Sequence, residues 1–104
     1  MIRGTTPTEV YKITGTDVDL SKCKQIWVTI VDFASREHFW DMDRLTIDPE
    51  QQTVSLTLSQ EETFSFAVGQ AYAQIRFLYD DDSAFASKKI KFVIEDIKKG
   101  GVIA

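Results

Sequence analysis

Residues 53–58 read TVSLTL, and this stretch gives the strongest indication of the fold. Val54, Leu56 and Leu58 alternate with three hydroxyl-bearing residues, so the apolar side chains share one face and the polar side chains the other. Alternation with a period of two is typical of a strand that buries only one of its faces. We therefore expect a strand here, covered on its apolar side by the rest of the chain.

Similar patterns occur on both sides of this stretch. We expect further strands at residues 9–13, 25–33, 37–45, 44–47, 71–79 and 88–96, although residues 37–45 alternate poorly. Residues 25–33 are largely apolar on both faces, which predicts a central strand covered on both sides. In the last predicted strand, the pattern directs Ile90, Phe92 and Ile94 inward.

Turn and helix signals separate these segments. Residues 17–22 and 80–83 are rich in Asp and Ser, whose side chains can bond to nearby backbone amides. Pro49 marks a further turn. Ser59 and Glu62 have the spacing of a capping box, so we expect a single helical turn between residues 59 and 66.

About seven short strands, with turns near every tenth residue, predict an all-β fold. We expect an antiparallel immunoglobulin-like β-sandwich with at most one short helical turn, and a small open barrel is the alternative architecture. A length of 104 residues allows one hydrophobic core, so residues 1–104 should form a single domain. Within it, residues 1–8 are expected to be an extended N-terminal arm and residues 98–104 a flexible tail.

Composition limits the classes of partner. Twelve basic and sixteen acidic residues give a net charge of −4, the wrong sign for binding nucleic acid or an anionic membrane. No apolar run reaches the roughly 18 residues that a membrane-spanning helix needs. The single Cys23, and the lack of an apolar leader after Met1, favour a soluble protein made in a reducing cytosol.

The residues that could carry chemistry are too few for a catalytic or metal site. His38 is the only histidine, which leaves a zinc site or a hydrolytic triad incomplete, and Cys23 is expected to be a structural thiol. Acidic groups at residues 17–19, 41–43 and 80–82 could supply oxygen to calcium, but none has the EF-hand spacing and Asp also favours turns. We therefore expect no enzyme activity, cofactor or metal.

Two further sets of charged residues are expected to lie on the surface without a catalytic role. Glu61 and Glu62 are adjacent and should diverge as solvated charges rather than form an acid–base pair. Arg76 should lie on the face opposite Ile75 and Phe77, where it could pair with a carboxylate such as that of Glu95.

Trp27 and Trp40 are the best candidates for binding among the apolar residues. Core packing is the first expectation for both, because both fall inside predicted strands. If either is exposed, it marks a contact surface, and with Tyr72 it could also recognise a carbohydrate or another ligand.

The N-terminal arm is the second candidate for contacts. Thr5, Thr6, Pro7 and Thr8 form a polar, extended segment that could add a strand to the exposed sheet edge of a neighbour. Head-to-tail contacts of this kind produce rings when the rotation closes.

Several of these segments also resemble a known group of sequences. Residues 1–8 (MIRGTTPT), residues 56–64 (LTLSQEETF), Gly69, residues 74–76 and residues 86–87 resemble small, largely uncharacterised proteins of phages and prophage-like elements of Gram-positive bacteria. The layout is also similar to the N-terminal β-sandwich domain of phage upper-baseplate proteins. Two parts of this chain depart from the pattern: residues 36–49 match nothing in it, and residues 80–83 replace an Asp-Gly hairpin turn.

The resemblance implies a non-enzymatic structural or assembly protein associated with a phage tail or baseplate. It implies homo-oligomers or contacts with other tail or baseplate proteins, and a location in the bacterial cytoplasm during assembly or in the virion. It carries over no catalytic, metal-binding or cofactor-binding residue. A carbohydrate-binding or ligand-binding β-sandwich module that uses exposed aromatic residues is the alternative function.

Overall fold

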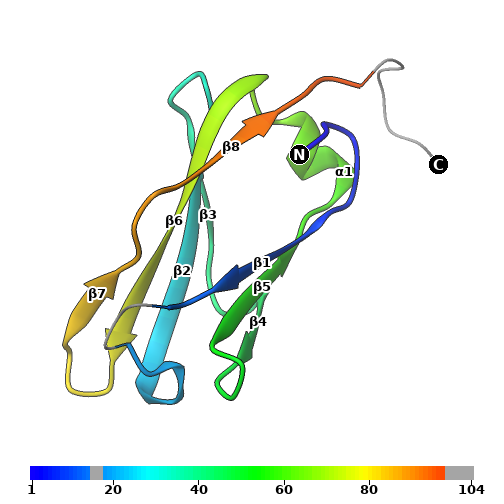
Figure 1. Cartoon of the computed structure of the whole chain (residues 1–104). Helices are drawn as coiled ribbons and strands as arrows, with labels where there is room; N and C mark the ends of the chain where they lie inside the picture. Colours follow the sequence, from blue (N-terminus) through cyan, green and yellow to red (C-terminus); the bar gives the residue numbers. More distant parts are fainter. Residues whose placement is uncertain (15–17, 98–104) are drawn as a thin grey trace.

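A computed structural model describes residues 1–14 and 18–97, which form two antiparallel sheets and one short helix (Figure 1). The three-stranded sheet has the order β1 (Thr8–Lys12), β5 (Thr53–Thr57), β4 (Leu45–Asp48). The five-stranded sheet begins with β3 (Glu37–Trp40), β2 (Cys23–Val31) and β6 (Gly69–Tyr79). Both β7 (Ala84–Ala86) and β8 (Ile90–Ile94) pair with the remaining edge of β6, one after the other. The described part of the chain is therefore mostly β and sandwich-like, as expected, with eight strands rather than about seven.

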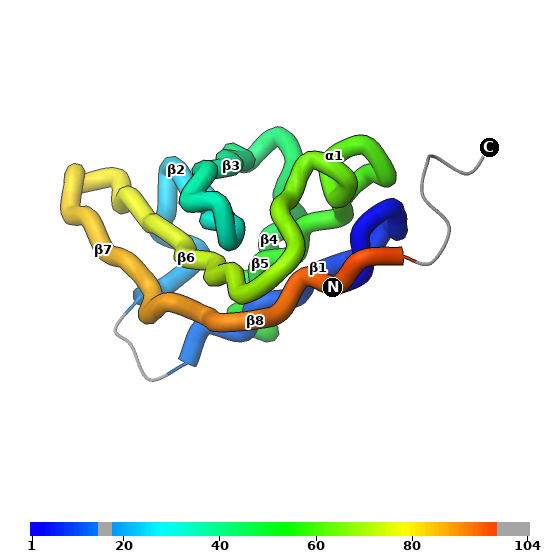
Figure 2. The backbone as a smooth tube through the Cα atoms, turned by 90° about the horizontal axis from the view of Figure 1, so that it is seen from above, coloured from blue at the N-terminus to red at the C-terminus, as the bar shows by residue number. Residues whose placement is uncertain are grey.

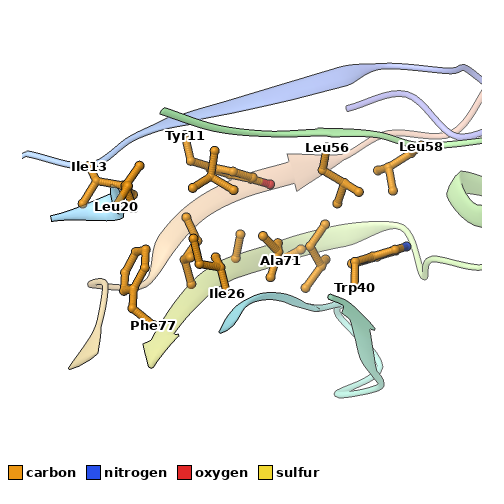
Figure 3. Packing of buried hydrophobic residues seen from close by; sticks show 14 of the residues in the cluster. Tyr11, Ile13, Leu20, Ile26, Trp40, Leu56, Leu58, Ala71 and Phe77 are labelled. Carbon is orange, nitrogen blue, oxygen red and sulfur yellow. The ribbon is translucent and has the colours of Figure 1, made fainter. Parts of the chain in front are cut away.

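The two sheets share one hydrophobic core. From the three-stranded sheet, Val54 and Leu56 of β5 are fully buried, as their alternation predicts. From the five-stranded sheet, the core receives Ile26, Val28 and Ile30 of β2, and Ala71, Ala73, Ile75 and Phe77 of β6. Figure 3 shows Leu56 of one layer facing Ile26, Ala71 and Phe77 of the other. The core therefore uses alternate residues of each strand and leaves the other set on the outside of the sheet.

The prediction that residues 25–33 are covered on both faces is wrong. Ile26, Val28 and Ile30 are buried, but Trp27, Thr29 and Val31 on the other face of β2 are only half-buried. β2 is central within its sheet, because β3 and β6 pair with its two edges. Two packed sheets have only one interface between them, so a strand can be central in hydrogen bonding and still keep one face uncovered.

Several strand ends differ from the predicted ones. β3 ends at Trp40 because residues 41–45 turn, with the Arg44 amide donating to the Asp41 carbonyl and the Leu45 amide to the Met42 carbonyl. The strand β7 was not predicted. Ile90, predicted to point inward, is 40% exposed, because it lies at the rim of the core beside a hollow of about 540 Å³ that Ile13 and Phe77 also line.

The predicted helical turn is present as α1 (Gln60–Phe64), and its capping box is complete. The Ser59 hydroxyl accepts from the Glu62 amide, while the Glu62 carboxylate accepts from the Ser59 amide at 2.9 Å. Glu62 is not the solvated charge that was expected: it is half-buried, pairs with Arg44 at 2.8 Å and accepts from the Trp40 indole at 2.6 Å. The hydrogen bond from the Arg44 guanidinium, together with those from the Ser59 amide and the Trp40 indole, lowers the pKa of Glu62. These effects outweigh burial, which acts to raise the pKa, and the pKa is about 2.

The predicted turn at residues 17–22 contains η1 (Leu20–Lys22), a single 3-10 turn. The Asp19 side chain accepts from the Ser21 amide at its start, as expected for an Asp-rich turn. Residue 17, at the beginning of that predicted region, lies outside the described residues, as does the predicted tail at residues 98–104.

Residues 1–8 do not form an extended arm. Ile2 bridges Glu95 in parallel beside the end of β8, which places the N-terminal segment next to that strand (Figure 2). The Gly4 amide donates to the buried Thr63 hydroxyl at 2.9 Å, and the Leu58 amide donates to the Pro7 carbonyl at 3.0 Å. Gly4 has a φ of +78°, and a Cβ at this position would overlap the Phe64 ring. The segment therefore folds back onto its own chain.

Candidate functional site

The candidate site is the uncovered side of the five-stranded sheet, which we call the outer face. It consists of the residues that alternate with the core positions of β3, β2, β6 and β8: Glu37, Phe39, Trp27, Thr29, Val31, Tyr72, Gln74, Arg76, Lys91 and Val93. Within the described part of the chain no other layer packs against this face. Four paired strands therefore present one continuous surface.

Strand register arranges these side chains in rows. Val31 pairs with Glu37 of β3 on one side and with Tyr72 of β6 on the other, and Tyr72 pairs with Lys91 of β8. One row across the sheet therefore reads Glu37, Val31, Tyr72, Lys91. Directly paired residues point to the same face, so the order within a row is also the order across the surface.

Two more rows follow toward the β7 end of the sheet. Thr29 pairs with Phe39 and Gln74, which gives a second row. Trp27 pairs with Arg76, and Arg76 pairs with Ala86 of β7, which gives a third. Arg76 is exposed while Ile75 and Phe77 are buried, as predicted, but its neighbour is Trp27 rather than Glu95, which lies beside Ile2.

The first row crosses a hollow on the outer face, which has a volume of about 620 Å³. Val31, Tyr72 and Gln70 line it, with Glu37 and Lys91 among its charged residues. Phe33, 68% exposed, lies at this hollow, and its ring is close enough to Gly69 that a Cβ there would overlap it. The hollow therefore combines apolar and polar side chains with opposite charges.

The third row borders a smaller hollow of about 470 Å³. Its lining residues are Trp27, Thr29, Phe39, Asp41 and Arg76. Phe39 is 63% exposed, an unusually high value for a phenylalanine within a strand. The indole, a carboxylate and a guanidinium therefore lie around one shallow depression.

Charge is divided between the two margins of the outer face. The β3 margin carries the carboxylates of Glu37 and Asp41, whereas the β8 margin carries the ammonium groups of Lys89 and Lys91. Lys89 lies 4.6 Å from the centre of the Tyr72 ring, a distance that permits a cation–π contact. The surface therefore has aromatic and polar side chains in the middle, carboxylates along one side and ammonium groups along the other.

A buried carboxylate supports one end of this face. Asp32 follows β2 directly, and its carboxylate accepts from the amides of Ala34, Arg36 and Ala67 and from the Arg36 guanidinium at 3.2 Å. The His38 ring nitrogen Nε2 lies 3.1 Å from the same carboxylate. Burial acts to raise the pKa of Asp32, but the hydrogen bonds from His38 and the amides outweigh it and lower the pKa to about 2.

This Asp32 network organises the turn after β2. The His38 ring packs edge-on against Phe66 at 4.7 Å, so its contacts are those of a packed side chain. His38 lines neither of the two hollows named on the outer face nor the hollow beside Ile90. Asp32 was not among the residues predicted to have a role. Its position directly after an apolar run and four residues before Arg36 was a usable signal.

The structure separates the two tryptophans. Trp40 is 8% exposed and lies in the core (Figure 3). The sequence predicts a contact role for a tryptophan only if its side chain is exposed. Trp40 is buried, so it does not belong to the contact surface. Trp27 is half-buried on the outer face and remains a candidate.

The expected strand exchange by Thr5, Thr6, Pro7 and Thr8 needs correction. The Thr5 carbonyl accepts from the Thr63 hydroxyl, the Pro7 carbonyl accepts from the Leu58 amide, and Thr8 is already part of β1. These backbone groups have partners within the chain, so they are not available as a template for a neighbour's sheet edge.

The remaining chemical candidates do not form a site. Cys23 is half-buried, and burial, with the nearby carboxylates of Asp19 and Asp80, raises the pKa of its thiol, which makes it a poor nucleophile. In the acidic group at residues 80–82, which was considered for calcium and not expected to bind it, Asp82 pairs with Lys24, and the Asp81 carboxylate accepts from the Ser83 amide. Among residues 1–14 and 18–97, no three metal-ligating side chains gather in a way that could hold an ion.

A search of the same residues for a helix that is long and apolar enough to cross a membrane finds none. Comparisons of the chain with protein-family models, with curated proteins and with solved structures find no match.

Proposed function

We propose that this chain is a non-enzymatic structural or assembly protein that works through protein contacts made by the outer face. The observation that carries the proposal is the uncovered apolar area on that face. Phe33, Phe39 and Val93 are 68%, 63% and 52% exposed, and half-buried Trp27 and Tyr72 lie on the same face. Exposed aromatic and aliphatic side chains that gather on one face, with charged residues at its margins, are typical of a protein interaction site.

The biological setting that we propose is a phage or prophage tail or baseplate. The resemblance of residues 1–8 and 56–64 to small phage-encoded proteins supports it. The partners are then other tail or baseplate proteins, or further copies of this chain, met in the bacterial cytoplasm during assembly or within the virion.

We also propose that the sandwich is immunoglobulin-like. Strand orders β1-β5-β4 and β3-β2-β6-β7/β8 correspond to the orders B-E-D and C′-C-F-G of that class, with no counterpart of its first strand among the described residues. Two features differ from antibody domains: the tryptophan on β2 points outward, and the chain has a single cysteine. The correspondence therefore concerns topology and not the composition of the core.

Co-expression with proteins encoded beside this chain tests the proposed function. Trp27→Ser combined with Phe39→Ser should abolish a complex that the unchanged protein forms, because both substitutions remove apolar area from the outer face. Val10→Ser is the matched control, since Val10 is 60% exposed but lies on β1 of the other sheet. The urea midpoint of each variant separates lost binding from lost folding.

Two results would contradict the proposed function. One is a chain that stays monomeric and binds none of these proteins. The other is a complex that the outer-face variant forms as well as the Val10→Ser variant does, which would place the contact elsewhere.

A second function is favoured by the smaller hollow. An indole platform beside the Asp41 carboxylate and the Arg76 guanidinium offers the stacking surface and the polar groups that bind a carbohydrate. A glycan array, followed by titration of tryptophan fluorescence, tests it. Binding that is lost in Asp41→Asn and kept in Asp43→Asn would support a sugar site, while silence across the array would exclude this function.

A further inference from the structure

We propose that the outer face binds the outer face of a second copy of this chain in a two-fold symmetric dimer. The axis runs parallel to the strands, between β2 and β6, so that β3 of one copy lies over β8 of the other. This inference rests on the proposed function, because it names the partner of the same surface.

The distribution of charge points to a second copy. A two-fold contact brings one patch against itself, so the patch must carry both signs of charge on opposite sides of the axis. The outer face meets this condition: Glu37 of β3 and Asp41 just after it lie on one side, and Lys91 of β8 and Lys89 just before it lie on the other. A face of a single sign would instead call for an oppositely charged, different protein.

Strand register converts this general match into specific pairs. Rotation about an axis parallel to the strands reverses the order within each row but keeps the row at the same height. The row Glu37, Val31, Tyr72, Lys91 then lies over Lys91, Tyr72, Val31, Glu37 of the second copy. Each Glu37 meets a lysine and each Val31 meets a tyrosine, and both contacts occur twice.

The third row adds an aromatic contact. Trp27 and Arg76 are direct neighbours on β2 and β6, on opposite sides of the axis. In the dimer the Trp27 indole therefore faces the second copy's Arg76, and the reverse contact forms as well. Arg is the cation that stacks best on an aromatic face, so these pairs stabilise the centre of the contact.

The other simple two-fold arrangement is unfavourable. An axis perpendicular to the strands would place β3 over β3 and β8 over β8. Glu37 and Asp41 would then face carboxylates, and Lys89 and Lys91 would face ammonium groups. Like charges opposed across a contact disfavour binding, so the charges select the parallel axis.

The size of the face sets the expected affinity. β3, β2, β6 and β8 are 4, 9, 11 and 5 residues long, which at about 3.3 Å per residue and about 4.8 Å between strands gives about 460 Å² per copy. The total of about 900 Å² is small for a specific interface, so we expect a weak dimer with a micromolar dissociation constant.

Charge reversal tests the arrangement. Glu37→Lys alone and Lys91→Glu alone each oppose like charges at two symmetric positions, and each should weaken the dimer about tenfold or more by sedimentation velocity. An equimolar mixture of the two variants should form a heterodimer near the unchanged affinity, because every reversed residue then meets an opposite charge. Within the described chain neither Glu37 nor Lys91 forms an ion pair, so no internal pair is lost.

The matched controls are Glu50→Lys and Lys12→Glu. They make the same charge changes at exposed positions outside the five-stranded sheet and should leave the dimer unchanged. If a reversal lowers the urea midpoint, Glu37→Gln and Lys91→Gln replace it and should each weaken the dimer by a smaller factor.

Three outcomes would overturn the inference: an unchanged protein that remains monomeric at high micromolar concentration, a dimer insensitive to both reversals, or a mixture that fails to restore association. None of these outcomes refutes the proposed function, provided that the Trp27→Ser, Phe39→Ser variant still fails to form the complex with the co-expressed protein. A complex that forms without the outer face would refute both the proposed function and the dimer.

Discussion

Replacing Asp32 with Asn should destabilise the protein by about 2 to 3 kcal/mol at pH 7. The carboxylate is buried and accepts from three backbone amides as well as from the Arg36 side chain. The amide nitrogen of Asn cannot accept a hydrogen bond, so the substitution leaves some of these donors without a partner. Unpaired buried donors and the loss of a charged acceptor are both costly.

The magnitude follows from the pKa of Asp32, which the hydrogen bonds lower from 3.8 to about 2 against the effect of burial. At 1.36 kcal/mol for each unit, the ionised carboxylate contributes about 2.5 kcal/mol to the free energy of unfolding. Because the folded pKa lies below the unfolded one, this contribution is complete above about pH 4 and is lost as the pH falls toward 2. The difference between the two proteins should shrink over that window.

Urea unfolding, followed by circular dichroism at pH 7, 5 and 3, measures this difference. Asp43→Asn is the control, because Asp43 is exposed and its substitution should change stability by less than about 0.5 kcal/mol. Glu62, with a pKa of about 2, loses its contribution in the same pH range in both proteins, so it cancels in the comparison. An Asp32→Asn variant as stable as the control, or a deficit that does not change with pH, would refute the reasoning.

Three further outcomes are expected. Glu62→Gln should lower the free energy of unfolding in urea by about 1 to 2 kcal/mol, because it removes an ion pair and weakens the capping box. Glu61→Gln, at an exposed position, should lower it by less than about 0.5 kcal/mol. Equal effects would contradict the role of the capping box. Gly4→Ala should cost at least about 1 kcal/mol in thermal unfolding, owing to its positive φ and the ring beside it, and a neutral result would argue for a loosely held N-terminal segment. Trp27→Phe should leave a fluorescence emission shifted to shorter wavelength and less quenched by acrylamide, because Trp40 is buried; an unshifted spectrum would contradict that burial.

Local signals predicted the elements that depend on local geometry. The alternation at residues 53–58 identified β5, and the three-residue spacing of Ser59 and Glu62 identified the capping box of α1. β7 escaped prediction because three residues, Ala84–Ala86, are too few for a period to be visible. The turn at residues 41–45 was missed because Met42 continues the alternation of Trp40, although three of the four residues from 41 to 44 are charged.

The candidate site was only partly predictable. Alternation correctly placed Arg76 on the face opposite Ile75, and Trp27 was singled out as a possible contact residue. The rows that join Trp27 to Arg76, and Glu37 to Lys91 through two other strands, depend on register between strands far apart in the chain. A single sequence does not contain that register.

The sequence by itself determined the mostly β character, the position of most strands and which residues of each strand share a face, because the side chains of a strand alternate whatever its partners are. Only the tertiary structure decided which faces are covered, since both faces of β2 are apolar enough to be buried and the number of layers selects one. It also decided the fate of residues 1–8, whose backbone finds partners such as Thr63 about sixty residues away. Contacts over such distances depend on how the sheets pack, which no local pattern records.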